Sequence, residues 1–191
     1  MTLTEGAVER PPEFLRRDAP QEQGDAVFAE LLLDTHRVTG VVGQAGAHRR
    51  LVDLLNTADG PVLTVRDATV ESLADPNEQP RRCPVLQVKR QSVLLAVPVT
   101  TAAPPRGGLE AVEKQPTAAT ILLPGIEVTG QIHLPPGADP ESVPLLGRRD
   151  FLPVTDAVVT QSAFTIVRWE QPLVVVNLDR AVLYVPGLAK S

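Results

Sequence analysis

The sequence predicts a mainly β protein, with two tandem five-stranded small antiparallel barrels and one short helix in the first unit. Three observations support this fold class: nineteen prolines and thirteen glycines in 191 residues, short valine-rich runs bounded by turn residues, and an internal duplication. Long helices tolerate few prolines or glycines, so a helical bundle is disfavoured. The chain is 43% hydrophobic but only 3% aromatic, so aliphatic side chains must fill its core.

The duplication consists of three pairs of segments that keep their order along the chain. The aligned pairs are 36–42 (HRVTGVV) with 126–132 (IEVTGQI), 63–70 (LTVRDATV) with 152–159 (LPVTDAVV), and 84–98 with 172–186. Thirteen of the thirty aligned positions are identical, and the offset changes only from 90 to 89 to 88 residues. This constancy indicates a repeated unit.

The repeated unit divides the chain into five parts. The predicted divisions are a disordered leader at 1–25, a first barrel repeat at 26–100, a Pro/Gly linker at 101–117, a second barrel repeat at 118–187 and a tail at 188–191. The leader is rich in proline, glutamine and acidic residues, which cannot bury a core. The linker contains paired prolines and paired glycines, which favour loops.

Strand patterns dominate both units. In the first unit the expected strands are Val27–Leu33, Arg37–Gly43, Val62–Val70, Val85–Lys89 and Ser92–Val99. In the second unit they are Thr120–Leu123, Glu127–Leu134, Leu152–Thr160, Leu173–Asn177 and Ala181–Val185. The glycine of the shared Val-Thr-Gly indicates a bulge or sharp bend. Five short strands joined mostly by tight turns are typical of a small barrel.

The connector after the second strand differs between the units. In the first unit Ala47–Asn56 places Leu51, Leu54 and Leu55 on one helical face, which predicts a short helix. In the second unit the segment PPGADPESVPLLG has too many prolines for more than one helical turn.

The order of these segments resembles the Sm-like (LSm) small-barrel family. That family has a second strand ending in Gly, a segment similar to NLxLxDA, and a strand–turn–strand similar to VxIRGDNVxYI. The matching segments here are Arg37–Gly40, Leu55–Asn56, Leu63–Ala68 and Val85–Val97 in the first unit, and Asn177–Val185 in the second. The resemblance covers most of both units through short motifs.

The resemblance implies association between barrels more strongly than it implies RNA binding. The family grips RNA with an Asp-x-x-x-Asn loop and an Arg-Gly-Asp-like turn. This chain has an insertion at the first place, and at the second it has 89–91 (KRQ) or 178–180 (LDR), without glycine. Sm-like barrels also pair their fourth and fifth strands between subunits into rings, and a tandem chain would close such a ring with half the usual number of subunits. The apolar runs VLLAVPV and LVVV would be hazardous as free edges.

The leading interpretation is a non-enzymatic protein that acts through protein–protein association or self-assembly. The expected interface residues lie in or beside the apolar strands: Val93, Leu95, Val97, Val174, Val176 and Trp169. The alternative is an Sm-like RNA-binding protein that contacts RNA through Lys89, Arg90 and Arg180 at the strand turns. A net charge of −5 provides no basic stripe, which disfavours nucleic acid as a partner.

No residue pattern indicates a catalytic, metal or cofactor site. Cys83 is the lone cysteine, the three histidines are scattered, and phosphate-binding glycine loops and a G-x-S-x-G elbow are missing. Asp67 and Asp156 recur at the same place in both units, where we expect them to cap a bend after the third strand. A third alternative, a small enzyme, would place one of these aspartates in a deep pocket between the units.

The sequence also bears on location. The N-terminus lacks an apolar signal region, and no run of about 18 apolar residues is present to span a bilayer. We therefore expect a cytoplasmic protein without membrane contact.

Overall fold

A computed structural model describes residues 27–43, 50–57, 60–75, 77–99, 114–145, 150–162 and 167–187. The first half (27–99) contains β1 (Val27–Leu32), β2 (His36–Val42), α1 (Leu51–Thr57), β3 (Val62–Ser72), β4 (Arg81–Lys89), the 3-10 helix η2 (Arg90–Ser92) and β5 (Leu95–Pro98). The second half (114–187) contains β6 (Gln115–Leu123), β7 (Ile126–Leu134), η3 (Pro140–Leu145), β8 (Phe151–Gln161), β9 (Val167–Asn177), η4 (Leu178–Arg180) and β10 (Leu183–Pro186).

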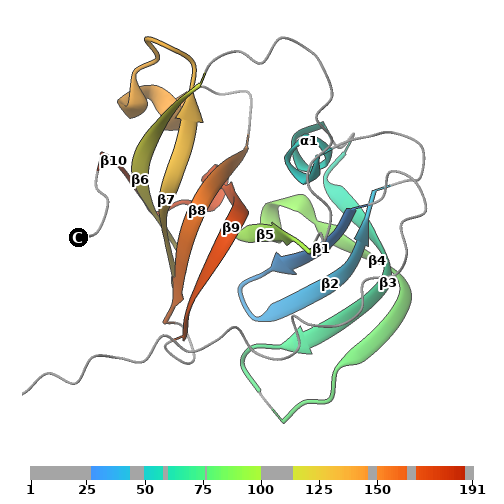
Figure 1. The fold of residues 1–191 in the computed structure, drawn as a ribbon. Helices are drawn as coiled ribbons and strands as arrows, with labels where there is room; N and C mark the ends of the chain where they lie inside the picture. The colour runs from blue at the N-terminus through green and yellow to red at the C-terminus, as the bar shows by residue number, and fades with distance from the viewer. Residues whose placement is uncertain are drawn as a thin grey trace, which may run out of the picture.

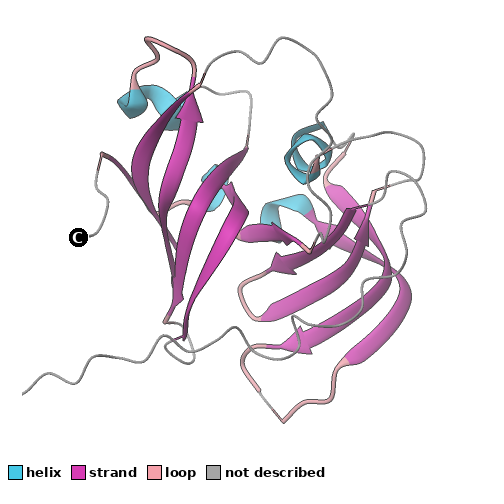
Figure 2. Ribbon diagram, viewed as in Figure 1, coloured by secondary structure: helices cyan, strands magenta, loops and turns pink. Residues whose placement is uncertain are grey.

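All ten strands belong to one antiparallel sheet, in the order β10-β6-β7-β8-β9-β5-β1-β2-β3-β4. Figures 1 and 2 show two curved groups of strands that meet where β9 and β5 lie side by side. The mainly β class is confirmed, but the two closed barrels are not. β5 pairs with β1 and with β9 of the other half, so it does not close the first half against β4.

The two halves have the same internal arrangement. The first half runs β5-β1-β2-β3-β4 and the second β10-β6-β7-β8-β9, with each pair of neighbours antiparallel. The pairing registers also agree. Val62 lies opposite Lys89, and Phe151, which is 89 residues after Val62, lies opposite Asn177, 88 residues after Lys89. Residues related by these offsets are called counterparts below.

A tight bulge occupies the same place in each half. The pairing register shifts at Gly40 between β2 and β3, and at Gly130 between β7 and β8. A Cβ atom added at either glycine would lie 2.7 Å from a backbone carbonyl oxygen, that of Arg66 or of Thr155. Only glycine allows the facing strand to approach this closely.

The recurring aspartates lie opposite these glycines. Asp67 has a φ of 48° and Asp156 a φ of 49°, both in the left-handed region that aspartate tolerates better than most residues. Each therefore bends its strand from within, in the middle of β3 and β8, and not after the strand end as expected. This bend explains why aspartate recurs at both positions.

Several boundaries differ from those predicted. β6 begins at Gln115, inside the predicted linker 101–117, and its first residues have no partner in β10, so Pro116 is tolerated. β4 and β9 begin four and six residues earlier than expected, because their first residues include exposed charged side chains that hide the strand pattern. The predicted leader, residues 101–113 of the predicted linker, and the tail lie outside the described residues.

The hydrophobic core has two clusters, and each contains side chains from both halves. The cluster within the second half includes four residues of the first: Leu32, Leu94, Leu95 and Val97. The cluster within the first half includes two residues of the second: Phe151 and Val175. Each half thus completes the other's core, so we treat the contact between β5 and β9 as structurally essential. None of the described helices is long and apolar enough to cross a membrane.

Candidate functional site

Five of the six predicted interface residues lie buried where the two halves meet, called the internal junction below. Leu95 of β5 pairs with Val176 of β9, and Ala96 pairs with Val175. Val93, Leu95, Val97, Val174 and Val176 are all 5% exposed or less. They are therefore part of an interface, but the strands that form it belong to one chain.

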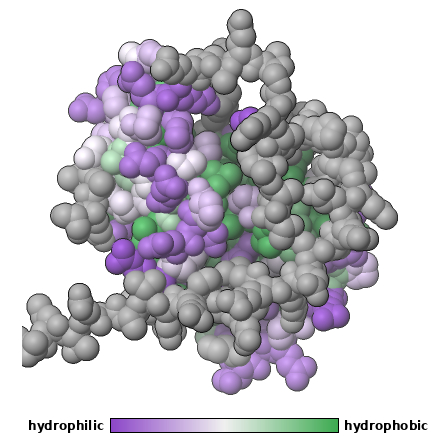
Figure 3. Space-filling view, in the orientation of Figure 1, coloured by the Kyte–Doolittle hydropathy of each residue, from purple (hydrophilic) through white to green (hydrophobic). Residues whose placement is uncertain are grey.

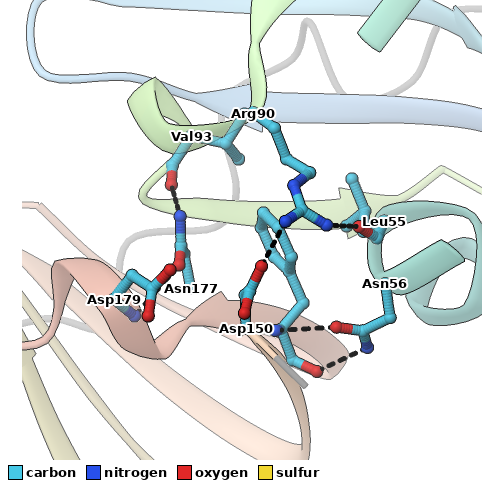
Figure 4. Close-up of polar contacts among 8 residues, drawn as sticks. Leu55, Asn56, Arg90, Val93, Asp150, Asn177 and Asp179 are labelled. Carbon is cyan, nitrogen blue, oxygen red and sulfur yellow. Dashed lines mark hydrogen bonds and ion pairs between the residues drawn. The ribbon is translucent and has the colours of Figure 1, made fainter. Parts of the chain in front are cut away.

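Backbone and side-chain hydrogen bonds fasten the internal junction beside these strands. The Asn177 backbone N–H donates to the Leu94 carbonyl oxygen at 3.0 Å, and its side-chain amide donates to the Val93 carbonyl oxygen at 2.9 Å. Asn177 is 1% exposed, so its amide needs these protein partners. Figure 4 shows this amide pointing from the end of β9 toward the first half.

A second group of polar contacts joins α1 and η2 to the start of β8. Asn56 donates to the Phe151 carbonyl oxygen at 2.8 Å and accepts from the Phe151 backbone N–H at 3.0 Å. Arg90 forms an ion pair with Asp150 and donates to the Leu55 carbonyl oxygen at 3.1 Å, as Figure 4 shows. These contacts hold α1, whose place in the second half is taken by the 3-10 helix η3, against β8.

The three predicted RNA-contact residues have different surroundings. Arg90 is engaged by Asp150, and Arg180 pairs with Asp34 at 2.8 Å and donates to the Gln91 carbonyl oxygen at 3.3 Å. Lys89 is exposed at the end of β4. Two of the three cations thus connect the halves across the internal junction and are already balanced by carboxylates.

The two outer strands of the sheet form a second kind of site, which we call the free edges. Among the described residues, β4 pairs only with β3, and β10 pairs only with β6. An unpaired strand edge presents backbone N–H and C=O groups to any compatible strand. The exposed large hydrophobic residues of the described chain lie on or next to these edges: Val62 (37% exposed), Val85 (58%), Val182 (73%) and Leu183 (49%).

An open pocket of about 390 Å³ lies along the β4 edge. Its apolar lining comes from β2, β3, β4 and the turn after β1: Leu33, Val38, Val70, Cys83, Leu86 and Val88. Its polar lining residues include His36, Gln87 and Ser92. The lining contains neither Asp67 nor Asp156, so this pocket does not match the one expected for an enzyme. Figure 3 shows one face of the molecule, on which hydrophobic residues reach the surface near its middle.

The remaining predicted residues are dispersed. Trp169 is half-buried on β9 and packs against the second-half core. His36 is hydrogen-bonded to the Thr35 hydroxyl at 2.9 Å, and His133 to the Thr155 hydroxyl at 2.7 Å. His48 lies outside the described residues. Over the described ranges, no three His, Cys, Asp or Glu side chains come together in a way that could hold a metal ion.

A charged cluster on the first half does not fit any of the predicted sites. Glu30 is 8% exposed and lies 4.0 Å from Arg37, whose guanidinium is hydrogen-bonded to Glu71 at 2.8 Å. Burial raises the pKa of the Glu30 carboxyl, Arg37 lowers it in part, and Glu71 raises it again. Its counterpart in the second half is Thr120, so the cluster is confined to one half.

Comparison with known protein families, with curated proteins and with solved structures finds no match to this chain. The site must therefore be judged from its own geometry. The sequence interpretation missed Val62, Val182 and Leu183, although the repeat offsets relate them to Phe151, Leu94 and Leu95. Applying those offsets to the expected interface residue Leu95 would have identified Leu183, whereas Phe151 and Leu94, the counterparts of Val62 and Val182, were not among the expected residues.

Proposed function

We propose that this chain is a non-enzymatic protein that acts through protein–protein association at its free strand edges. In this proposal the halves are tandem copies of one small-barrel-type unit, and the chain serves as a scaffold or assembly subunit. The observation that carries it is the pair of edges, β4 and β10, that have no further strand partner among the described residues. Leu183 on β10 and Val182 just before it are exposed, and an open apolar pocket lies beside β4. In monomeric proteins such edges are normally covered by another element or protected by charged residues, prolines or bulges.

The internal junction supports this function because it is an example of the same kind of association. There, two strand edges from different halves pair, and the hydrophobic residues beside them become buried. Edges built from counterpart residues, at both ends of the sheet, have no second strand partner within the described ranges.

The test is native mass spectrometry of the protein at micromolar concentration, purified without nuclease treatment. We expect species heavier than one 20.5 kDa chain, made of protein alone. Val182→Glu should return the protein to a single chain, because the added charge would be buried by any strand that pairs there. Asn77→Glu adds the same charge on an exposed turn and should leave the mass unchanged. A wild-type protein that is a bare monomer contradicts the proposal.

Val93 and Val174 are unsuitable as test positions, although the sequence suggests them. Both are 0% exposed, so a charge there would disrupt the core and not association alone. The RNA-binding alternative is less well supported, since Arg90 and Arg180 are balanced by carboxylates. Additional mass equal to a bound oligonucleotide in the same experiment would favour that alternative.

A further inference from the structure

We infer that the partner at the free edges is a second copy of this chain, joined head to tail. β10 of one copy pairs with β4 of the next, in the register that β5 and β9 use inside the chain. This inference rests on the proposed function and specifies its partner.

The backbone leading into β10 is held like that leading into β5. The Leu94 N–H donates to the Leu32 carbonyl oxygen at 2.8 Å, and the Val182 N–H donates to the Leu122 carbonyl oxygen at 2.7 Å. η2 and η4 precede the two strands at counterpart positions. β10 therefore presents the same geometry to its free side that β5 presents to β9.

The register follows from the counterparts of the internal pairs. Within the chain Leu95 lies opposite Val176, and Ala96 opposite Val175. Between copies the same register places Leu183 opposite Val88, and Tyr184 opposite Gln87. The bond from Asn177 N–H to Leu94 becomes one from Lys89 N–H to the Val182 carbonyl oxygen.

The pocket beside β4 is the counterpart of a filled region in the second half. Its half-buried lining residues Leu33, Val70 and Leu86 have the counterparts Leu123, Val159 and Val174, which are all buried, at 4% exposed or less. In the second half Leu94, Leu95 and Val97 belong to the same core cluster as these residues. In an assembly, their counterparts Val182, Leu183 and Val185 would occupy the pocket of the next copy.

The exposed residues agree with this arrangement. Leu94 and Leu95 are each 1% exposed, whereas their counterparts Val182 and Leu183 are 73% and 49% exposed. Phe151 is fully buried at the internal junction, and its counterpart Val62 is 37% exposed. Thus three of the four exposed large hydrophobics among the described residues are counterparts of residues that the internal junction buries.

The two edges differ from each other, so the contact has a direction. β10 carries the projecting side chains and β4 has the pocket, which makes the interface heterologous and able to close into a ring. Pairing of two β10 edges would leave the pocket beside β4 empty. Pairing of two β4 edges would bring two pockets together without the apolar side chains of β10 to fill them. A head-to-tail arrangement pairs both strand edges and fills the pocket at the same time.

The two ion pairs across the internal junction have no charged counterparts at the free edges. The counterparts of Arg90 and Asp150 are Leu178 and Pro61, and those of Arg180 and Asp34 are Ser92 and Pro124. The contact between copies therefore depends on apolar burial and backbone hydrogen bonds. We expect its dissociation constant to change by less than about twofold as salt is raised, because screening acts on charge pairs.

The test mixes two variants that each block one edge. Val182→Glu blocks β10. Gln87→Pro blocks β4, because alternation from the Asn177 N–H places the Gln87 N–H on the free side, where proline removes a donor without disturbing β3. We expect each variant alone to be a monomer by native mass spectrometry, and their mixture to form a dimer containing one chain of each. Circular dichroism and thermal unfolding of each variant would verify folding.

Each other outcome has a definite meaning. Dimers of Gln87→Pro alone would indicate pairing of two β10 edges, and dimers of Val182→Glu alone would indicate pairing of two β4 edges; both overturn the head-to-tail inference. If both variants keep the oligomeric mass of the wild type, the association occurs at another surface. That result overturns the head-to-tail inference but not association itself. A monomeric wild type overturns the proposed function.

A cross-link tests the register independently of proline. Leu95 and Val176 form a non-hydrogen-bonded pair by the same alternation, the spacing at which a disulfide fits an antiparallel ladder. In a Cys83→Ser background, Leu183→Cys with Val88→Cys should yield disulfide-linked copies on mild oxidation. Leu183→Cys with Leu86→Cys, shifted by two residues, should yield few. Equal cross-linking of both pairs would overturn the register.

Discussion

Counterpart strands in the two halves have the same backbone arrangement but different neighbours. The start of β5 inserts Leu95, with Leu94 just before it, into the core of the other half, whereas the start of β10 leaves Leu183, with Val182 just before it, exposed. The residue types are alike, so the burial of each pair depends on whether a neighbouring strand is present. Hydrophobic residues alone thus do not determine which edge is covered, because a strand is buried by partners distant in sequence.

The polar residues differ more than the apolar ones. At the internal junction Asn56, Arg90 and Asn177 make specific contacts with the opposite half. The corresponding positions at the free edges lack both ion pairs. We interpret the internal junction as a permanent contact and the free edges as a reversible one, and the following predictions test how far the halves differ.

The largest expected difference is between Phe151 and its counterpart Val62. Phe151 is 0% exposed and packs with the core of the first half, so Phe151→Ala should lower the free energy of unfolding by about 3–5 kcal/mol. Val62 is 37% exposed, so Val62→Ala should cost less than about 1 kcal/mol. Urea unfolding at equal, low protein concentration measures both. Similar costs would mean that the junction does not depend on Phe151.

The second prediction concerns a feature in which the halves should not differ. Gly40→Ala and Gly130→Ala each place a Cβ atom 2.7 Å from a backbone oxygen of the facing strand, so both bulges must open. Each substitution should cost about 1–3 kcal/mol, as overpacking does. Each variant serves as the other's control in thermal and urea unfolding. A neutral effect in one half would show that its bulge adapts differently.

These residues also show how far sequence reasoning reaches. The shared Val-Thr-Gly predicted a bend at Gly40 and Gly130, and a bulge occurs at both. The Asp67 and Asp156 bends lie inside their strands because a left-handed residue can sit at a bulge without ending the strand. Such local features follow from side-chain and backbone preferences near in sequence.

Features that depend on long-range pairing were not predicted in the same way. Leu95 and Val176 were identified as interface residues from their apolar runs, but the sequence does not specify which copy of a strand pairs with which. In the structure they pair with each other inside the chain. The order of strands in a sheet is set by contacts over many residues, so the same local pattern fits a pairing within a chain or between chains.

The third prediction concerns the two ion pairs across the internal junction. Removing Arg90 and Asp150 singly and together in a double-mutant cycle should give a coupling of about 0.5–1 kcal/mol, because both side chains are only partly exposed. The same cycle on Arg180 and Asp34, where Asp34 is 48% exposed, should give a smaller value. Both couplings should shrink at high salt. Equal values would indicate that exposure does not control them.

The smallest predicted effect is a pH dependence of stability that comes from Glu30 in the first half and is not expected at its counterpart in the second half. Burial raises the pKa of the Glu30 carboxyl above its ordinary value of 4.5, so between that value and the raised one the folded state binds more protons than the unfolded state. Stability contributed by this group is therefore present below about pH 4.5 and lost as pH rises through the raised pKa. Glu30→Gln should raise Tm by about 2 °C at pH 7 and leave it unchanged at about pH 4.

The control for this prediction is Thr120, the uncharged counterpart of Glu30, whose hydroxyl lies 3.3 Å from that of Thr129. Thr120→Ser keeps a hydroxyl and should shift Tm equally at both pH values, because no proton is exchanged there. A Glu30→Gln shift that is also independent of pH would contradict a buried carboxylate as its cause. The hydrogen bond between Arg37 and Glu71 would then account for the stability of the cluster without a contribution from Glu30.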